Sequence, residues 1–259
     1  MGKPKIGIYS LTCCEGCQLE ILNCEDELLD IANAIDIVSF GMAQSNNIDV
    51  DLDIAFVEGT VVQESEIQLL KTIRKQSKVL VAIGACATYG GVAAIQFAED
   101  REKLKEIVYG AAGKFIPSIT PSPLHKYVKV DLALQGCPIE KSQFLKTVGH
   151  VLHGDGPILP DYPVCTECKR KENECVLIHH NIPCLGPITA AGCDARCPTH
   201  FNGCDGCFGP VEEANVAMEY NILLAKGIDK DEIKRKMDVF ASTAEVFSDQ
   251  PSVKDSDAG

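Results

Sequence analysis

Residues 79–86, Val-Leu-Val-Ala-Ile-Gly-Ala-Cys, join a continuous apolar run to a glycine and a cysteine. A short run that is apolar at every position is typical of a strand buried on both faces, as in a parallel sheet covered by helices. The carboxyl ends of such strands line the ligand crevice of an open α/β sheet. The segment therefore predicts the fold class and places Cys86 at the edge of the sheet where ligands bind.

Strands and helices alternate on both sides of this segment. Besides Val79–Ile83, we expect strands at Lys5–Ser10, Ile35–Phe40, Asp53–Val57 and Val130–Leu134. Apolar residues at helical spacing predict helices at Gln18–Ala32, Glu64–Gln76, Glu99–Tyr109 and Ile139–His153. This alternation predicts an α/β domain in which helices cover both faces of a parallel sheet.

The cysteines divide the chain of 259 residues into two parts. Six of the 14 cysteines are spread before residue 155, and the other eight lie within residues 165–207. Glycines and prolines between residues 154 and 163 indicate a boundary, so we place one domain at 1–155 and a second at 156–259. The second begins with irregular loops. Helices are expected at Pro210–Gly227 and from Asp229 onwards, and a frayed tail from Ser248.

Composition disfavours several classes of function. The net charge of −13 and the absence of Trp argue against binding to nucleic acid or to anionic membrane surfaces. We find no signal peptide, no twin-arginine pair and no apolar run long enough to span a membrane. We therefore expect a cytoplasmic protein without a membrane partner, in which thiols stay reduced and bind metal.

Three predicted strands end in cysteines. Cys14 and Cys17 follow the first strand, Cys86 follows Val79–Ile83, and Cys137 follows Val130–Leu134. We expect them to converge, because parallel strands end at one edge of a sheet. Four thiolates suit an iron–sulfur cube, and the adjacent glycines let the backbone approach sulfur. A zinc site, or small buried side chains, are the alternatives.

The later cysteines form two further sets of four, each with a Cys-x2-Cys pair. They are Cys165, Cys168, Cys175 and Cys184, followed by Cys193, Cys197, Cys204 and Cys207. Packing alone does not require this density, so we interpret them as metal or cluster ligands. Two zinc sites in a scaffold without redox activity, or a ferredoxin-like carrier, remain as alternatives. A row of clusters would carry electrons one at a time between distant sites.

Taken together, these motifs resemble those of nickel–iron hydrogenase small subunits. Cys14-Glu15-Gly16-Cys17, Gly84-Ala85-Cys86-Ala87 and Gly136-Cys137-Pro138 resemble the motifs of the proximal cluster. The segments around Cys193 to Pro198 and Gly203 to Pro210 resemble the medial-cluster region. The resemblance covers residues 5 to about 212. It implies a flavodoxin-like, doubly wound sheet, followed by an irregular iron–sulfur cluster domain with C-terminal helices.

The resemblance also implies an order of clusters. The proximal cluster would be held by Cys14, Cys17, Cys86 and Cys137, the medial one by Cys193, Cys197, Cys204 and Cys207, and the distal one by Cys165, Cys168, Cys175 and Cys184. The periplasmic branch of the family has His in place of Cys165 and no thiolate in place of Cys197. Cysteine at both positions implies three 4Fe–4S clusters and resembles the cytoplasmic multimeric hydrogenases, in particular the delta subunit of the sulfhydrogenase type.

The resemblance implies two protein partners. The large subunit of the family carries the nickel–iron site, and this chain lacks the nickel motifs Arg-x-Cys-x2-Cys and Cys-x2-Cys-x2-His. Electrons would pass between that site and a further iron–sulfur or flavin subunit of the diaphorase type, linked to NAD(P) or a similar acceptor. The related cluster subunit of respiratory complex I is an alternative, although it lacks the eight later cysteines.

Six further residues near the predicted clusters have expected roles. Cys13 neighbours Cys14 but is expected to be unligated, and Cys24 to belong to the core. His179 and His180 are read as surface residues or as neighbours of the distal ligands. Glu20 and Glu58 give the hypothesis of a proton path, with a solvated or interfacial carboxylate as the alternative.

Overall fold

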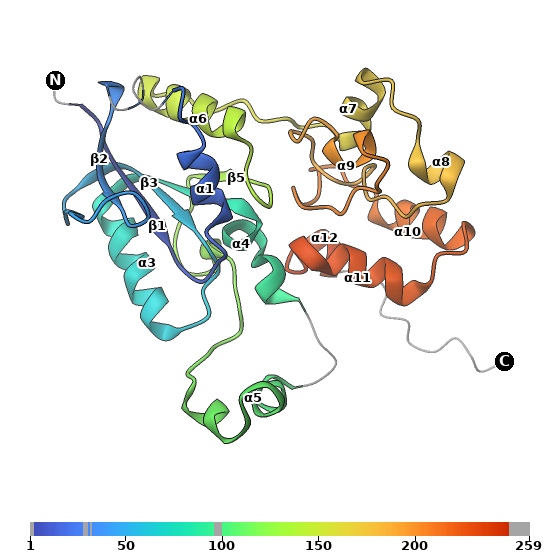
Figure 1. Ribbon diagram of the computed structural model, residues 1–259, viewed down its shortest axis with the longest axis horizontal. Coiled ribbons are helices and arrows are strands. Elements are labelled where there is room, and N and C mark those ends of the chain that lie inside the picture. The colour runs from blue at the N-terminus through green and yellow to red at the C-terminus, as the bar shows by residue number, and fades with distance from the viewer. Residues whose placement is uncertain (1–2, 28–30, 32, 96–99, 249–259) are drawn as a thin grey trace. The chain divides into compact units, whose positions relative to one another are not determined.

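The structure, a computed structural model, describes residues 3–27, 31, 33–95 and 100–248. Within this part of the chain, five strands form one sheet in the order β2-β1-β3-β4-β5 (Figure 1). Every neighbouring pair is parallel. The strands are β1 (Lys5–Ser10), β2 (Asp36–Phe40), β3 (Leu52–Glu58), β4 (Ser77–Ile83) and β5 (Leu132–Leu134). This is the strand order of flavodoxin-like sheets, so the predicted doubly wound α/β fold is confirmed.

The chain forms two compact units, Met1–Ile158 and Leu159–Gly259. The described α-helices of the first unit are α1 (Gly16–Leu22), α3 (Glu64–Gln76), α4 (Gly84–Tyr89), α5 (Arg101–Tyr109) and α6 (Lys141–His153). Three short 3-10 helices accompany them: η1 (Gly91–Ala94), η2 (Gly110–Phe115) and η3 (Leu124–Lys126).

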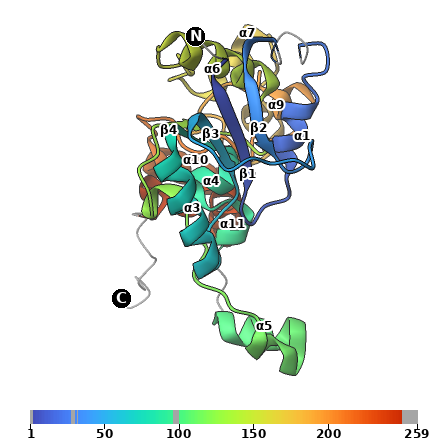
Figure 2. The same ribbon diagram turned by 90° about the vertical axis from the view of Figure 1, so that its left-hand side faces the viewer.

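Helices cover both faces of the sheet, as Figures 1 and 2 show. On one face, α3 packs Leu70 and its two buried isoleucines into a core that contains Ala55 and Val57 of β3. The residue between them, Phe56, points to the other face and meets Phe144 of α6, with ring centroids 5.1 Å apart. The alternation along β3 therefore buries the strand from both sides.

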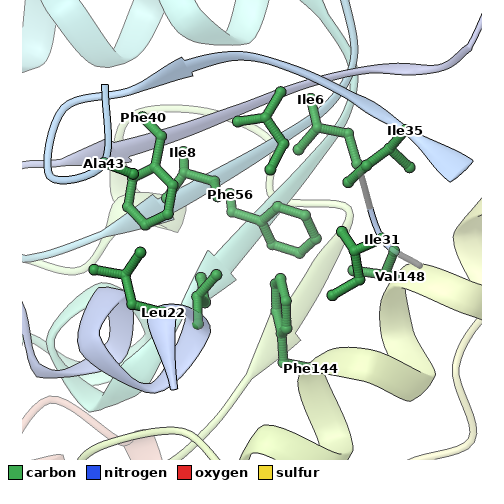
Figure 3. Close-up of a pocket in the computed structure, with 12 residues that line it drawn as sticks. Ile6, Ile8, Leu22, Ile31, Ile35, Phe40, Ala43, Phe56, Phe144 and Val148 are labelled. Carbon is green, nitrogen blue, oxygen red and sulfur yellow. The ribbon is translucent and has the colours of Figure 1, made fainter. Parts of the chain in front are cut away.

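An apolar cavity of about 160 Å³ lies between the sheet and helices α1 and α6 (Figure 3). Ile6 and Ile8 of β1, Phe56 of β3 and Phe144 of α6 are among its lining residues. Every residue that lines it is apolar. It lacks the convergent polar groups that orient a ligand, so we treat it as part of the hydrophobic core.

Several elements begin or end at other residues than predicted, for local reasons. The strand expected at Val130–Leu134 begins at Leu132. At the preceding residue, the Asp131 amide donates to the Leu80 carbonyl, but the Leu80 amide donates to the Asp131 carboxylate instead of a backbone carbonyl, both at 2.9 Å. A helix is expected at Gln18–Ala32, but α1 ends at Leu22. Residues 28–30 and 32 of the expected helix lie outside the described residues. α5 begins after Asp100, whose carboxylate accepts the Glu102 amide hydrogen, and residue 99 is likewise not described.

The second unit consists of loops and helices. Its described helices are α7 (Val164–Arg170), α8 (Val176–His180), α9 (Arg196–Thr199), α10 (Val216–Ala225), α11 (Lys230–Ala241) and α12 (Glu245–Ser248). The first three were not predicted, because helices of four to seven residues are too short to show periodicity. α11 opens at Asp229 as expected, and α10 starts later than Pro210 because Asn215 caps it.

In the part of the chain that the structure describes, no helix has both the length and the apolar character needed to cross a membrane.

Candidate iron–sulfur sites

The first candidate site lies at the carboxyl edge of the sheet. Cys14 follows β1 and Cys17 lies in α1, while Cys86 in α4 follows β4 and Cys137 follows β5. The Ala85 amide donates to the Gly136 carbonyl at 2.7 Å, which joins the loops of Cys86 and Cys137. The structure therefore brings the strand ends that carry these cysteines to one edge.

Glycines leave space beside the sulfur atoms of this first site. A Cβ on Gly84 would lie 2.4 Å from the Cys17 Sγ, and one on Gly91 would lie 2.8 Å from the Cys86 Sγ. Both glycines have positive φ angles, +82° and +53°, which side chains rarely adopt. A backbone that approaches sulfur this closely is what a buried cluster site requires, because amide groups then surround the thiolates.

The thiols of this site influence one another electrostatically. Burial, and then the charges of Cys137 and Cys14, raise the pKa of Cys86 to about 12. Burial, and then the charge of Glu58, also raise the pKa of Cys17. Without bound iron these thiols hold their protons, so metal binding must supply the positive charge that makes them thiolates.

Cys13 and Cys24 are the other two cysteines of the first unit. The Cys13 thiol donates to the Leu11 carbonyl at 3.5 Å, and burial, the charge of Glu58 and the charge of Cys86 raise the pKa of Cys13. Cys24 is fully buried and donates to the Glu20 carbonyl, also at 3.5 Å. Cys24 therefore belongs to the core, as expected.

The second candidate site surrounds α7 and α8. Cys165 and Cys168 lie in α7, Cys175 immediately precedes α8, and Cys184 lies in the following loop. Burial, and then the charges of Cys184, Cys168 and Cys175, raise the pKa of Cys165 to about 12. A Cβ on Gly186 would lie 3.4 Å from both Cys165 Sγ and Cys184 Sγ. These four thiols therefore form one group.

The third candidate site is built from two pairs. Cys193 and Cys197 flank the start of α9, and their charges influence one another. Cys204 and Cys207 form the other pair. Cys193 and Cys207 both pack against the small core of Ala190, Phe208 and Val211, which links the two pairs.

Backbone amides are directed at sulfur in the second unit. The Cys204 amide donates to Cys184 Sγ at 3.2 Å, so the second and third groups are adjacent. Burial raises the pKa of Cys193, while hydrogen bonds from the amides of Arg196 and Ala195 lower it. Amide donors to sulfur are a feature of iron–sulfur sites, where they stabilise the charge of the cluster. The donors and the open space beside sulfur thus fit clusters at these positions.

Among the described residues, no group of three or more Cys, His, Asp or Glu side chains is close enough to hold a single metal ion. A four-iron cluster does not require that proximity, because each thiolate binds its own iron atom. His179 and His180 lie on the surface and face Glu174, at 3.9 and 3.3 Å.

Two buried glutamates contact the cysteine loops. Glu58 is only 1% exposed, and its carboxylate accepts the amide hydrogens of Cys17 and Gln18, both at 3.1 Å. It is therefore not solvated, and the proton path stays a hypothesis. Glu167 is 8% exposed and accepts the amide hydrogens of Gly192 and Ala195. Sequence reasoning missed Glu167, because a glutamate inside Cys-x2-Cys gives no sign of burial.

Comparison with known proteins places the chain in a family. The family described as NADH ubiquinone oxidoreductase, 20 Kd subunit, matches residues 14–151. Sulfhydrogenase 2 subunit delta of Pyrococcus furiosus is 39% identical over 92% of this chain and 99% of its own length. A vhu subunit of the F420-non-reducing hydrogenase of Methanocaldococcus jannaschii is 32% identical over 81% of this chain and 83% of its own length.

A solved structure of an NAD+-reducing [NiFe]-hydrogenase in the H2-reduced state shares the fold. A chain of that enzyme is 27% identical, with a TM-score of 0.56, over 61% of this chain and 96% of its own length. The chain therefore belongs to the NADH ubiquinone oxidoreductase 20 kDa subunit family, and within it to the hydrogenase small subunits of the sulfhydrogenase delta type.

Proposed function

We propose that this chain is the electron-transfer subunit of a nickel–iron hydrogenase, with three 4Fe–4S clusters. One observation carries the proposal: twelve cysteines lie in three groups of four, one at the carboxyl edge of the sheet and two in the second unit. Clusters bound there would accept and release electrons one at a time. The chain's own residues supply the thiolates, the amide donors and the space beside sulfur.

The proposed assignment follows the family motifs. Domain 1–155 holds the proximal cluster on Cys14, Cys17, Cys86 and Cys137. Domain 156–259 holds the medial cluster on Cys193, Cys197, Cys204 and Cys207, and the distal cluster on Cys165, Cys168, Cys175 and Cys184. A cytoplasmic location fits fourteen cysteines that form no disulfide with one another.

Two partners belong to the proposal. A large subunit holds the nickel–iron site, since the nickel-binding motifs are absent from this sequence. A further iron–sulfur or flavin subunit exchanges electrons with an acceptor such as NAD(P); NAD+ is the acceptor named for the enzyme of similar fold. The complex I alternative is weaker, because the family match ends at residue 151, before the eight later cysteines.

The test uses the complex as it is purified without oxygen. Hydrogen is added, and reduction of the clusters is followed by electron paramagnetic resonance and by bleaching of the brown colour. We expect hydrogen to reduce the clusters of this chain. Cys175→Ser should alter one set of signals, whereas Cys24→Ser, a change in the hydrophobic core, should alter none. A complex whose iron–sulfur signals do not respond to hydrogen would contradict the proposal.

A further inference from the structure

Glu167 occupies an unusual position in the second unit. It lies in α7 between Cys165 and Cys168, yet its side chain points into the protein and is 8% exposed. Buried carboxylates are rare unless they are paired or hydrogen-bonded. The contacts of this carboxylate therefore indicate why a charge is retained there.

Both oxygens of Glu167 accept backbone amide hydrogens from another cysteine loop. Oε1 accepts from Gly192 at 2.9 Å, and Oε2 accepts from Ala195 at 3.0 Å. These two amides flank Cys193, which belongs to a different group of cysteines from the two neighbours of Glu167. One side chain thus ties the Cys193 loop to the helix that carries Cys165 and Cys168.

The Cys193 loop has a conformation that needs such a tie. Gly192, Asp194 and Ala195 have φ angles of +126°, +56° and +48°. Two consecutive residues with side chains in the left-handed region are unfavourable, so surrounding contacts must hold them there. The Glu167 carboxylate, which accepts from the amides of Gly192 and Ala195, supplies two of these contacts.

The carboxylate also acts on sulfur. The Ala195 amide that donates to Glu167 also hydrogen-bonds with Cys193, and the negative charge of Glu167 acts on that thiol. The carboxylate therefore competes with Cys193 for a donor and places a negative charge beside it. Both effects disfavour the addition of an electron to a cluster bound by Cys193.

Glu58 has the same arrangement in the first unit. It is buried, and it accepts the amide hydrogens of Cys17 and Gln18 from a strand far away in sequence. Two unrelated parts of the chain thus use a buried carboxylate to hold the backbone of a cysteine loop. This repetition favours a positioning role for the carboxylate over an incidental contact.

We propose that Glu167 is a positioning residue that fixes the Cys193 loop to α7 and keeps the midpoint potential of the cluster at Cys193 low. The part of this inference that concerns the potential of the cluster rests on the proposed function. The part that concerns the hydrogen bonds of Glu167 does not. Glu167→Ala removes both hydrogen bonds to the Cys193 loop. Glu167→Gln keeps the shape of the side chain and removes its charge. Glu174→Gln, at an exposed glutamate between α7 and α8, is the control.

Three readouts test this proposal on the complex purified without oxygen. Hydrogen–deuterium exchange should show lost protection of the Gly192 and Ala195 amides in Glu167→Ala, with protection elsewhere unchanged. Redox titration followed by electron paramagnetic resonance should show one cluster with a raised midpoint potential in Glu167→Gln. Iron content should fall by about a third in Glu167→Ala, as for the loss of one four-iron cluster of three, and stay unchanged in Glu174→Gln.

Two results would overturn the proposal. One is wild-type amide protection together with wild-type iron content in Glu167→Ala. The other, which applies even when the alanine variant does not fold, is an unchanged midpoint potential for every cluster in Glu167→Gln. Failure of the proposed function looks different, because the wild-type protein would then lack iron and sulfide, or its clusters would not respond to hydrogen, while the exchange experiment still reports on the hydrogen bonds of Glu167.

Discussion

Gly84→Ala tests the geometry of the strand-end site. The added Cβ would lie 2.4 Å from Cys17 Sγ, whereas ordinary contacts begin at 3.4 Å. One of the two groups must therefore move by about 1 Å, and metal–ligand distances tolerate only about 0.2 Å. The φ angle of +82° adds strain of about 1–2 kcal/mol. We expect the variant to fold but to lose the cluster bound by Cys17.

Gly154→Ala is the matched control. Gly154 has the same φ angle of +82°, but a Cβ there would meet no atom within 4 Å. The two variants share the backbone strain and differ in the contact with sulfur. Iron and sulfide are measured on protein purified without oxygen. We expect about eight iron atoms per chain in Gly84→Ala and about twelve in Gly154→Ala. Equal iron contents in the two variants would refute the reasoning.

Three further predictions concern stability, each measured by denaturant unfolding. Phe144→Ala should lower the free energy of unfolding by about 3–5 kcal/mol, because it removes the ring that packs against Phe56 beside an existing cavity; a loss below about 1 kcal/mol would contradict this packing. Although burial raises the pKa of Asp131, the Leu80 amide and Arg74 lower it to about 2. The stability that this ionised carboxylate contributes should be complete above about pH 4 and lost towards pH 2, and Asp131→Asn should remove that pH dependence. Burial raises the pKa of Glu219 from 4.5 to about 7, and its Oε1 has no hydrogen-bond partner among the residues that the structure describes. Between about pH 4.5 and 7, the folded protein retains a proton that the unfolded chain loses, so the wild type should lose stability as the pH rises through this range. Glu219→Gln should therefore be more stable than the wild type at pH 8 but not at pH 4. Equal stability of the variant and the wild type at both pH values would contradict this.

Sequence patterns predicted the first unit well, because its signals are local. The helix at Glu64–Gln76 has the predicted bounds, since its apolar residues recur at helical spacing and Glu66 closes a capping box. The strands β1 and β4 could be recognised from short apolar runs. The shortened β5 could not, because it depends on the Asp131 side chain reaching Leu80, 51 residues away.

The same distinction applies to the candidate sites. The convergence of Cys86 and Cys137 follows from a general property of parallel sheets. The contacts of Glu58 with Cys17 and of Glu167 with Gly192 join residues 41 and 25 positions apart. Neither glutamate lies in a pattern that marks burial, so only the folded chain reveals them. The short helices α7 and α8 were missed because seven and five residues are too few to show a helical period.

The content of iron and sulfide tests the central claim most directly. The chain is purified without oxygen, together with the proteins that accompany it, and iron, acid-labile sulfide, zinc and nickel are measured per mole. Three four-iron clusters predict about twelve iron and about twelve sulfide in this chain, and nickel only when a larger subunit is present. Two zinc ions without sulfide would contradict the claim that this chain transfers electrons.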